Sequence, residues 1–397
     1  MSNETVSRQT AAPIRRTALL WAVIPFLVLA AAIAWLYGTN PLQSFENGAP
    51  PVENLTYERT ILDNGGLRLL VRAGGSEPLK IAQVQVDAAY WQFTLDPPGP
   101  LARGKSAWIS IPFPWVLGEA HRVTVVTSTG TTFEHEIPVA VPTPEVTSGS
   151  LLSQGILGAF VGILPVAIGL MFYPALRGAG PGAIRFLLAV TVGLLAFLLV
   201  DAIAEAFELA GESAPVFQGG AMVVFAAAAS FLLLMAVSRR GGRPSGMALA
   251  TYIAIGIGLH NLGEGLAIGG AFAAGSAGLG AFLVMGFTLH NITEGIGIAA
   301  PLLKIRPTFR QFALLTLIAG GPAVLGMWIG SLAYAPHWSA LALAIGAGAI
   351  LQVIIEVMLF MLRNDDDRME ILFSKEVMGG LALGITVMYV TAMLVKI

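Results

Sequence analysis

The chain contains no cysteine in its 397 residues and only five histidines. Disulfides, thiolate metal ligands and cysteine nucleophiles are therefore excluded in any compartment. Charged residues are also scarce at 12%, about half the share of a soluble globular protein. Hydrophobic residues make up 55% and the mean hydropathy is +0.75, so most of the chain is expected to lie in a lipid bilayer. The net charge of -2, without a rich basic block, argues against nucleic acid as a partner.

The N-terminal region combines a polar segment with a long apolar run. Residues 1–17 carry three arginines, and the apolar run 18–37 follows them directly. This order predicts a cytoplasmic N-terminus and an uncleaved signal-anchor transmembrane helix. A cleaved signal peptide is the alternative, because small residues surround Ala32 and Ala34, but its apolar region is usually only about 7–15 residues long.

Residues 45–143 have a different composition, with short alternating runs such as "KIAQVQVDAAYWQF" and "HRVTVVTS" between Gly- and Pro-rich turns. Regularly spaced short strands predict a small all-β sandwich of immunoglobulin-like size on the extracytoplasmic side. Residues 144–150 are expected to form a linker.

The remaining residues, 151–397, contain eight apolar runs that are each long enough to span a bilayer as a helix. The runs cover residues 151–175, 183–209, 216–238, 247–273, 278–303, 311–335, 338–362 and 375–396. The fold class expected is therefore an all-α polytopic membrane bundle, preceded by the anchor helix and the sandwich.

The basic residues of the connections test this topology. With the N-terminal arginines in the cytoplasm, every Lys and Arg between bundle helices falls on the cytoplasmic side, as the positive-inside rule requires. These residues are Arg177, Arg185, Arg239, Arg240, Arg243, Lys304, Arg306, Arg310, Arg363, Arg368 and Lys375. The sandwich and the C-terminus are then extracytoplasmic, and a multi-pass protein of the plasma or inner membrane is expected.

One polar phrase occurs twice within the apolar runs. "HNLGEG" begins at His260 and "HNITEG" begins at His290. On a helix, residues four apart share a face, so His260 and Glu264 face one neighbour, as do His290 and Glu294. Both phrases lie near the middle of their runs, where ionised groups are costly unless they are paired, hydrated or bound to a cation.

The chemistry of the repeated phrase favours a shared metal site. Two imidazoles and two carboxylates, with amide oxygens from Asn261 and Asn291, suit a divalent transition ion such as Zn²⁺, Fe²⁺ or Mn²⁺. Interhelical hydrogen bonding is the alternative, since buried polar residues also hold membrane helices together. The repetition of the whole phrase at matched depth favours the metal site.

On the fourth and fifth of eight bundle helices, the two phrases resemble those of the ZIP family of zinc- and iron-transporting permeases, over residues 151–397. The resemblance implies that His260, Asn261, Glu264, His290, Asn291 and Glu294 bind a metal ion carried into the cytoplasm by alternating access. The family usually has a Glu-Pro in the sixth helix, whereas this chain has Gly321 before Pro322. The resemblance therefore implies one bound ion rather than an adjacent pair.

Further polar residues in the apolar runs are candidates for the transport pathway. Asp201 and Glu205 lie four residues apart near one end of their run, where they could attract cations. Gln352 and Glu356 lie one helical turn apart near the opposite side, where Glu356 is expected to be a release-side ligand. For each residue the alternative is a solvated or hydrogen-bonded structural role. His121 and His135 are expected to be ordinary strand histidines and His337 interfacial, rather than metal ligands.

The function expected is transport of a divalent transition metal, with Zn²⁺ as the first substrate candidate and Fe²⁺, Mn²⁺ or Cd²⁺ as others. The chain is not expected to be an enzyme. A non-transporting metal sensor or receptor is one alternative. An intramembrane metallohydrolase is another, disfavoured because no acid is left over as a base. The partners expected are the metal ion, the bilayer and, where the chain dimerises, a second copy.

Overall fold

The N-terminal unit, Met1–Pro51, contains helix α1, Arg16–Thr39. The computed structural model describes residues 16–39, 51–145, 147–273, 277–333, 335–362 and 368–395. The anchor run 18–37 is therefore helical as expected, with Pro25 inside the helix. The predicted cytoplasmic segment lies, except for its last two residues, outside the described part of the chain.

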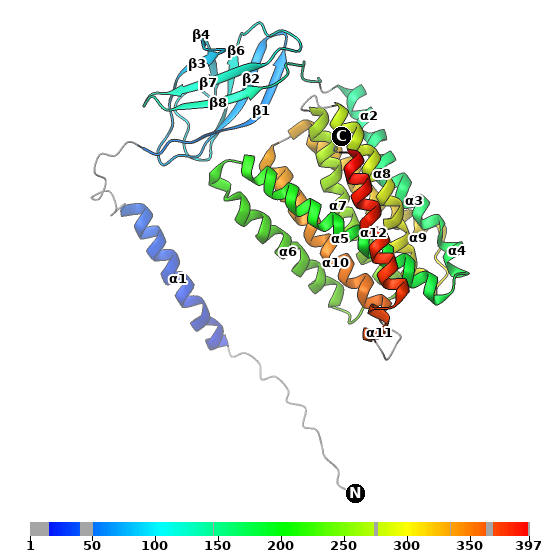
Figure 1. Ribbon diagram of the computed structural model, residues 1–397. Helices are drawn as coiled ribbons and strands as arrows, with labels where there is room; N and C mark the ends of the chain where they lie inside the picture. The colour runs from blue at the N-terminus through cyan, green and yellow to red at the C-terminus, as the bar shows by residue number, and fades with distance from the viewer. Residues whose placement is uncertain are drawn as a thin grey trace. The chain divides into compact units, whose positions relative to one another are not determined.

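The second unit, Val52–Ile397, begins with a β-sandwich, which confirms the all-β expectation (Figure 1). Two four-stranded antiparallel sheets have the orders β1-β2-β6-β5 and β4-β3-β7-β8. The strands are β1 Leu55–Asp63, β2 Gly66–Ala73, β3 Ile81–Val86, β4 Ala89–Trp91, β5 Thr94–Asp96, β6 Ser106–Ile111, β7 His121–Thr127 and β8 Thr132–Ile137. Asp63 pairs with Gly66, so Asn64 and Gly65 form the two-residue hairpin turn that an Asn-Gly pair favours.

The core of the sandwich follows from the alternation of its strands. In β6 every second residue is buried, and Ile109 and Ile111 lie among the fully buried side chains. The matching positions of β2 and β7, such as Leu69 and Val123, are also fully buried. The apolar faces of the two sheets thus enclose one core, as the period of two in the sequence predicts.

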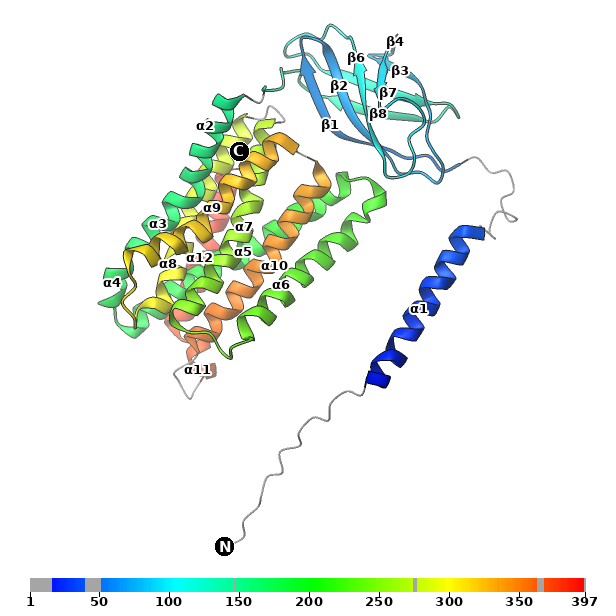
Figure 2. The same ribbon diagram turned by 180° about the vertical axis from the view of Figure 1, so that it is seen from behind.

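The bundle begins at Ser148, and a helix covers each of the eight predicted runs (Figure 2). The first run is divided into α2 Ser148–Gly158, the π-helical segment η2 Ala159–Ile163, α3 Leu164–Met171 and α4 Tyr173–Arg177. The other helices are α5 Pro181–Glu212, α6 Gly219–Arg239, α7 Gly246–Ala273, α8 Ala277–Ala299, α9 Phe309–Ala333, α10 Pro336–Met361, α11 Arg368–Leu372 and α12 Lys375–Val395. Short 3₁₀ turns, η3 Pro215–Phe217 and η4 Ala300–Leu302, precede α6 and follow α8.

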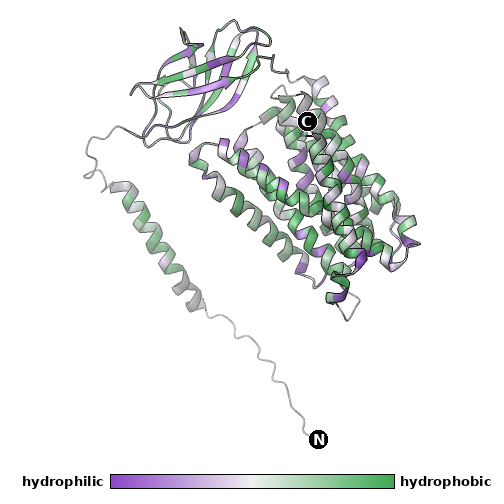
Figure 3. Ribbon diagram, viewed as in Figure 1, coloured by the Kyte–Doolittle hydropathy of each residue, from purple (hydrophilic) through white to green (hydrophobic). Residues whose placement is uncertain are grey.

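The helices have the length and composition of membrane spans. Within the described residues, seven helical segments of the bundle are long and apolar enough to cross a bilayer, and the 23-residue α8 packs among them. Figure 3 shows that apolar residues dominate these helices and that polar residues are few within them. The helical membrane bundle expected from the sequence is therefore confirmed.

Small residues bring the central helices together. A Cβ built on Gly265 of α7 would lie 2.1 Å from the backbone oxygen of Ala323 in α9, and one on Gly295 of α8 would lie 2.4 Å from that of Val166 in α3. Only glycine permits backbones to approach this closely, which is typical of helix contacts in membranes. These contacts place α7 and α8 inside the bundle, with α3 and α9 against them.

Candidate metal centre

The two repeated phrases lie in the buried interior of the bundle. His260, Asn261 and Glu264 come from α7, and the corresponding residues of the second phrase come from α8. All six side chains are at most 4% exposed. The 3.6-residue period of the helix places the histidine and glutamate of each phrase on one face, as the spacing predicts.

Glu264 lies between the two imidazoles. Its Oε1 accepts a 2.7 Å hydrogen bond from Nε2 of His290 and lies 3.0 Å from Nε2 of His260. The two rings are 6.3 Å apart between centroids. The carboxylate of α7 thus bridges the histidines of both helices, and the two phrases form one cluster.

Three residues of the cluster have the spacing of metal ligands. One ligand atom each from His260, His290 and Glu294 lies within 4.8 Å of the other two. Buried polar groups are normally paired, yet Oε1 of Glu294 has no hydrogen-bond partner among the described residues, and Nε2 of His260 has only its 3.0 Å ion-pair contact with Glu264. These atoms are therefore available to a cation, and two imidazoles with a carboxylate suit a divalent transition ion.

The side-chain N–H groups of the two asparagines are used in hydrogen bonds. Asn261 donates through Nδ2 to the backbone oxygen of Ala319 in α9, at 3.0 Å, and weakly to Glu294 at 3.4 Å. Asn291 donates through Nδ2 to the backbone oxygen of Val161, at 3.0 Å, and to Glu264 at 3.3 Å. Each asparagine therefore contacts the glutamate of the other phrase.

The backbone oxygen of Val161 is free to accept this bond for a local reason. Pro165 stands four residues after Val161 and has no N–H to donate to it. The chain forms the π-helical segment η2 at this point, and Asn291 supplies the missing donor. The Oδ1 atoms of both asparagines find no partner in the described part of the chain, so they stay available as oxygen ligands.

The sixth bundle helix, α9, contributes a backbone oxygen rather than a side chain to this network. Gly321 lies one helical turn from the exposed residues Leu317 and Leu325, on the same face of α9. A Cβ built on Gly321 would meet nothing within 4 Å. Gly321, which stands where the family usually has a glutamate, therefore faces away from the contact between α9 and Asn261.

The acidic pair of α5 divides into two environments. Glu205 is half-buried. Asp201, one turn earlier, is exposed. Glu205 is therefore the less exposed member of this pair.

Gln352 and Glu356 are both buried in α10, at 1% and 3% exposure. Glu356 is bonded to Ser238 and Arg239 at the end of α6, at 3.0 Å in each case. The sequence does not identify Arg239 as a functional candidate, because an arginine at the cytoplasmic end of a helix is common in membrane proteins. Its contact with Glu356 becomes visible only when α6 is packed against α10.

The histidines of the sandwich each have a separate partner. His121 bonds to Asp87 at 2.8 Å, and His135 bonds to the hydroxyl of Thr60 at 2.8 Å and stacks on Tyr57. Desolvation lowers the pKa of His135. The metal-ligand cluster found in the described residues includes neither of them, nor His337, which is buried in the first turn of α10.

The fold and the site define a multi-pass helical membrane protein with a buried cluster of metal-ligand side chains. The family model described as ZIP zinc transporter matches residues 239–392, from the last residue of α6 into α12. Residues 239–392 are therefore similar to a ZIP zinc transporter domain, and the members of that family are divalent-metal transporters rather than enzymes. No curated protein matches the chain.

Proposed function

We propose that the protein carries a divalent transition metal across the membrane through the site between α7 and α8, with Zn²⁺ as the first substrate candidate. The observation that supports this most is the buried cluster of His260, His290 and Glu294, whose ligand atoms lie within 4.8 Å of one another. Glu264 and the free Oδ1 atoms of Asn261 and Asn291 complete the proposed ligand set.

The protein's own residues prepare this site for a cation. Asn261 and Asn291 are fixed by backbone oxygens of neighbouring segments, so their side chains keep the glutamates in place. The hydrogen bond from His290 to Glu264 would have to open for the ion to use both groups, since a metal replaces the proton on a ligand nitrogen. Metal binding is therefore expected to compete with protons.

The direction of transport is proposed from the charges of the connections. With the basic loops in the cytoplasm, the end of α5 at Asp201 and Glu205 is extracytoplasmic and the end of α10 at Glu356 is cytoplasmic. A cation would enter past Glu205, bind at the central cluster and leave past Gln352 and Glu356, as the helices expose the cluster to each side in turn.

Uptake into proteoliposomes tests the substrate and the coupling. Purified full-length protein would be given Zn²⁺, Fe²⁺, Mn²⁺ and Cd²⁺ in turn, with an imposed pH gradient in half of the samples. Accumulation of at least one ion above the level of protein-free liposomes is expected. No accumulation of any of the four ions would overturn the proposal.

A non-transporting metal sensor is the second candidate, because α9 offers the site only the backbone oxygen of Ala319. In that case the protein would bind metal tightly in equilibrium dialysis and give no uptake.

We also propose a homodimer, in which a second copy rather than lipid contacts the exposed apolar residues of α6, such as Phe225 and Leu233. Native mass spectrometry of the protein in nanodiscs would distinguish a dimer from a monomer surrounded by lipid.

A further inference from the structure

Glu356 is a buried acid whose counter-ion belongs to the protein itself. Its side chain is 3% exposed, and its Oε1 accepts from the hydroxyl of Ser238 and from Nη2 of Arg239, both at 3.0 Å. The Arg239 side chain is 29% exposed. Because Glu356 is buried, its ionised carboxylate needs a nearby positive charge to be stable. The guanidinium of Arg239 is partly exposed and keeps access to water.

The end of α6 is held at Glu356 by contacts along α10. A Cβ on Gly348 would lie 2.2 Å from the backbone oxygen of Ala227, so the two helices touch there through their backbones. The hydroxyl of Ser230 donates to the backbone oxygen of Ile345 at 2.8 Å. These contacts fix the register of α6 and α10, which brings Ser238 and Arg239 to the acid.

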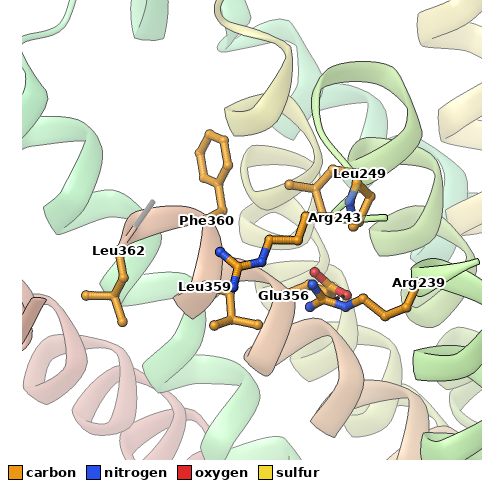
Figure 4. A pocket seen from close by; sticks show the side chains of 8 residues that line it. Arg239, Arg243, Leu249, Glu356, Leu359, Phe360 and Leu362 are labelled. Atoms are coloured by element: carbon orange, nitrogen blue, oxygen red, sulfur yellow. Dashed lines mark ion pairs between the residues drawn. The ribbon is translucent and has the colours of Figure 1, made fainter. Parts of the chain in front are cut away.

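A small pocket opens beside this ion pair. It has a volume of about 160 Å³, enough for several water molecules, and Arg239, Arg243 and Glu356 line it together with apolar residues. Figure 4 shows the Arg239 guanidinium against the Glu356 carboxylate, with Arg243 lining the same pocket. Water can therefore reach a cation bound at Glu356.

Gln352 lies between Glu356 and the central cluster along α10. On α10, a Cβ at Gly346 would lie 3.2 Å from Cα of His260, and Gln352 follows six residues later. Its Oε1 would lie 3.1 Å from a Cβ at Gly256 of α7, and neither amide atom finds a partner in the described residues. Gly346 to Glu356 spans ten residues, or about 15 Å of helix, so an unpaired buried amide stands between the two charged centres.

We propose that Glu356, Ser238 and Gln352 form a second cation site and that Arg239 occupies it as a tethered cation, which an arriving metal ion displaces. This inference rests on the proposed transport function. The ligands are all oxygens, and the single carboxylate gives weak binding compared with the imidazole cluster. Arg239 then closes the exit when no ion is present and swings into the pocket when one arrives.

The number of ions bound per chain tests this role of Arg239. Full-length protein would be dialysed to equilibrium in detergent against the lowest Mn²⁺ concentration that saturates Arg239→Gln, at which Arg239 still competes for Glu356 in wild type. The variants compared with wild type are Arg239→Gln, Glu356→Gln and the double variant. Without its tethered cation, Arg239→Gln is expected to bind one more ion than wild type. The double variant is expected to return to the wild-type number. Arg240→Gln removes the neighbouring charge and is the matched control, expected to bind as wild type does.

The comparison separates this inference from the proposed function. If the central cluster bound no ion, wild type would bind none, yet Arg239→Gln would still gain one ion that the double variant loses. An unchanged number in Arg239→Gln, or a gain that persists in the double variant, would overturn the inference.

A second measurement keeps Arg239 in place, in case its replacement prevents folding. Leu359 lines the pocket, and the chain has no natural cysteine, so Leu359→Cys introduces a single thiol. At a Mn²⁺ concentration high enough to displace Arg239, the alkylation rate of this thiol is expected to change severalfold, and Glu356→Gln is expected to abolish that change. Equal rates with and without Mn²⁺ would contradict the displacement of Arg239.

Discussion

His290 of α8 donates a 2.7 Å hydrogen bond to Glu264 of α7, so the histidine of one repeated phrase holds the acid of the other. The asparagines continue this crossed arrangement, because Asn261 contacts Glu294 and Asn291 contacts Glu264. The repeat therefore builds one site from two helices rather than two separate sites. A change in either phrase is expected to affect the whole cluster.

Asn291→Ala is expected to weaken metal binding without removing a histidine or a carboxylate. The change removes the donor to Val161 and the contact with Glu264, and loss of such supporting bonds typically lowers metal affinity by about 10- to 100-fold. Equilibrium dialysis against Zn²⁺ would measure the affinity. Thr288→Ala is a suitable control, since that hydroxyl bonds only within its own helix, and equal affinities for the two variants would refute the supporting role.

Gly265→Ala is expected to destabilise the bundle. Its Cβ would fall 2.1 Å from the backbone oxygen of Ala323, so α9 would have to move, and overpacking of this kind costs about 1–3 kcal/mol. Gly321→Ala is the matched control in α9, where the new Cβ meets nothing and alanine favours the helix by up to about 1 kcal/mol. Thermal unfolding in detergent should give a lower midpoint for Gly265→Ala only. Equal losses in both variants would contradict the close approach of α7 and α9.

Gly321→Glu is expected to leave the number of bound metal ions unchanged. The residue shares a face of α9 with exposed Leu317 and Leu325, so a new carboxylate would point away from the Asn261 contact. Counting the ions bound after equilibrium dialysis against Zn²⁺ would check this. An additional ion in Gly321→Glu would show that this face of α9 does reach the site.

The sandwich is expected to lose stability on acidification through His135. Because burial lowers the pKa of His135 in the folded state, the unfolded chain takes up the proton first, and stability falls as the pH drops below the ordinary value of about 6.5. The effect is about 1.4 kcal/mol for each unit by which the pKa is lowered. Amide exchange in β7 and β8 of the full chain, corrected for the intrinsic pH dependence, would measure it between pH 7.5 and 5.5.

His135→Gln should flatten that pH dependence, since glutamine cannot take up a proton in this range. His121 is the comparison residue, because it bonds to Asp87 and so makes a contact separate from the bond between His135 and Thr60. A His135→Gln variant with the same pH profile as wild type would show that another group controls it.

Much of the fold could be predicted from the sequence because each part carries a strong local signal. The eight apolar runs gave helices close to their expected bounds, and the alternation around Ile109 and the Asn64-Gly65 turn gave strands and a hairpin. The spacing of His260 and Glu264 was enough to place both on one helix face. These signals depend on neighbours in the chain.

The remaining features depend on contacts between distant segments. The π-helical segment at 159–163 requires both Pro165 and the donor from Asn291, more than a hundred residues away in sequence. The partner of Arg239 is set by the register of α6 on α10, which the apolar sequence of α6 does not specify. Helix rotation likewise decides that Gly321 faces away from the site.

Zn²⁺ uptake by proteoliposomes that contain Glu264→Gln tests the central claim most directly. Glu264 bridges both histidines, and the substitution keeps its size while removing the charge that a metal ion requires. Thr288→Ala, reconstituted to the same density, serves as the control. We expect uptake by wild type and Thr288→Ala, and uptake at the level of protein-free liposomes for Glu264→Gln. Wild-type uptake by Glu264→Gln would contradict transport through this site.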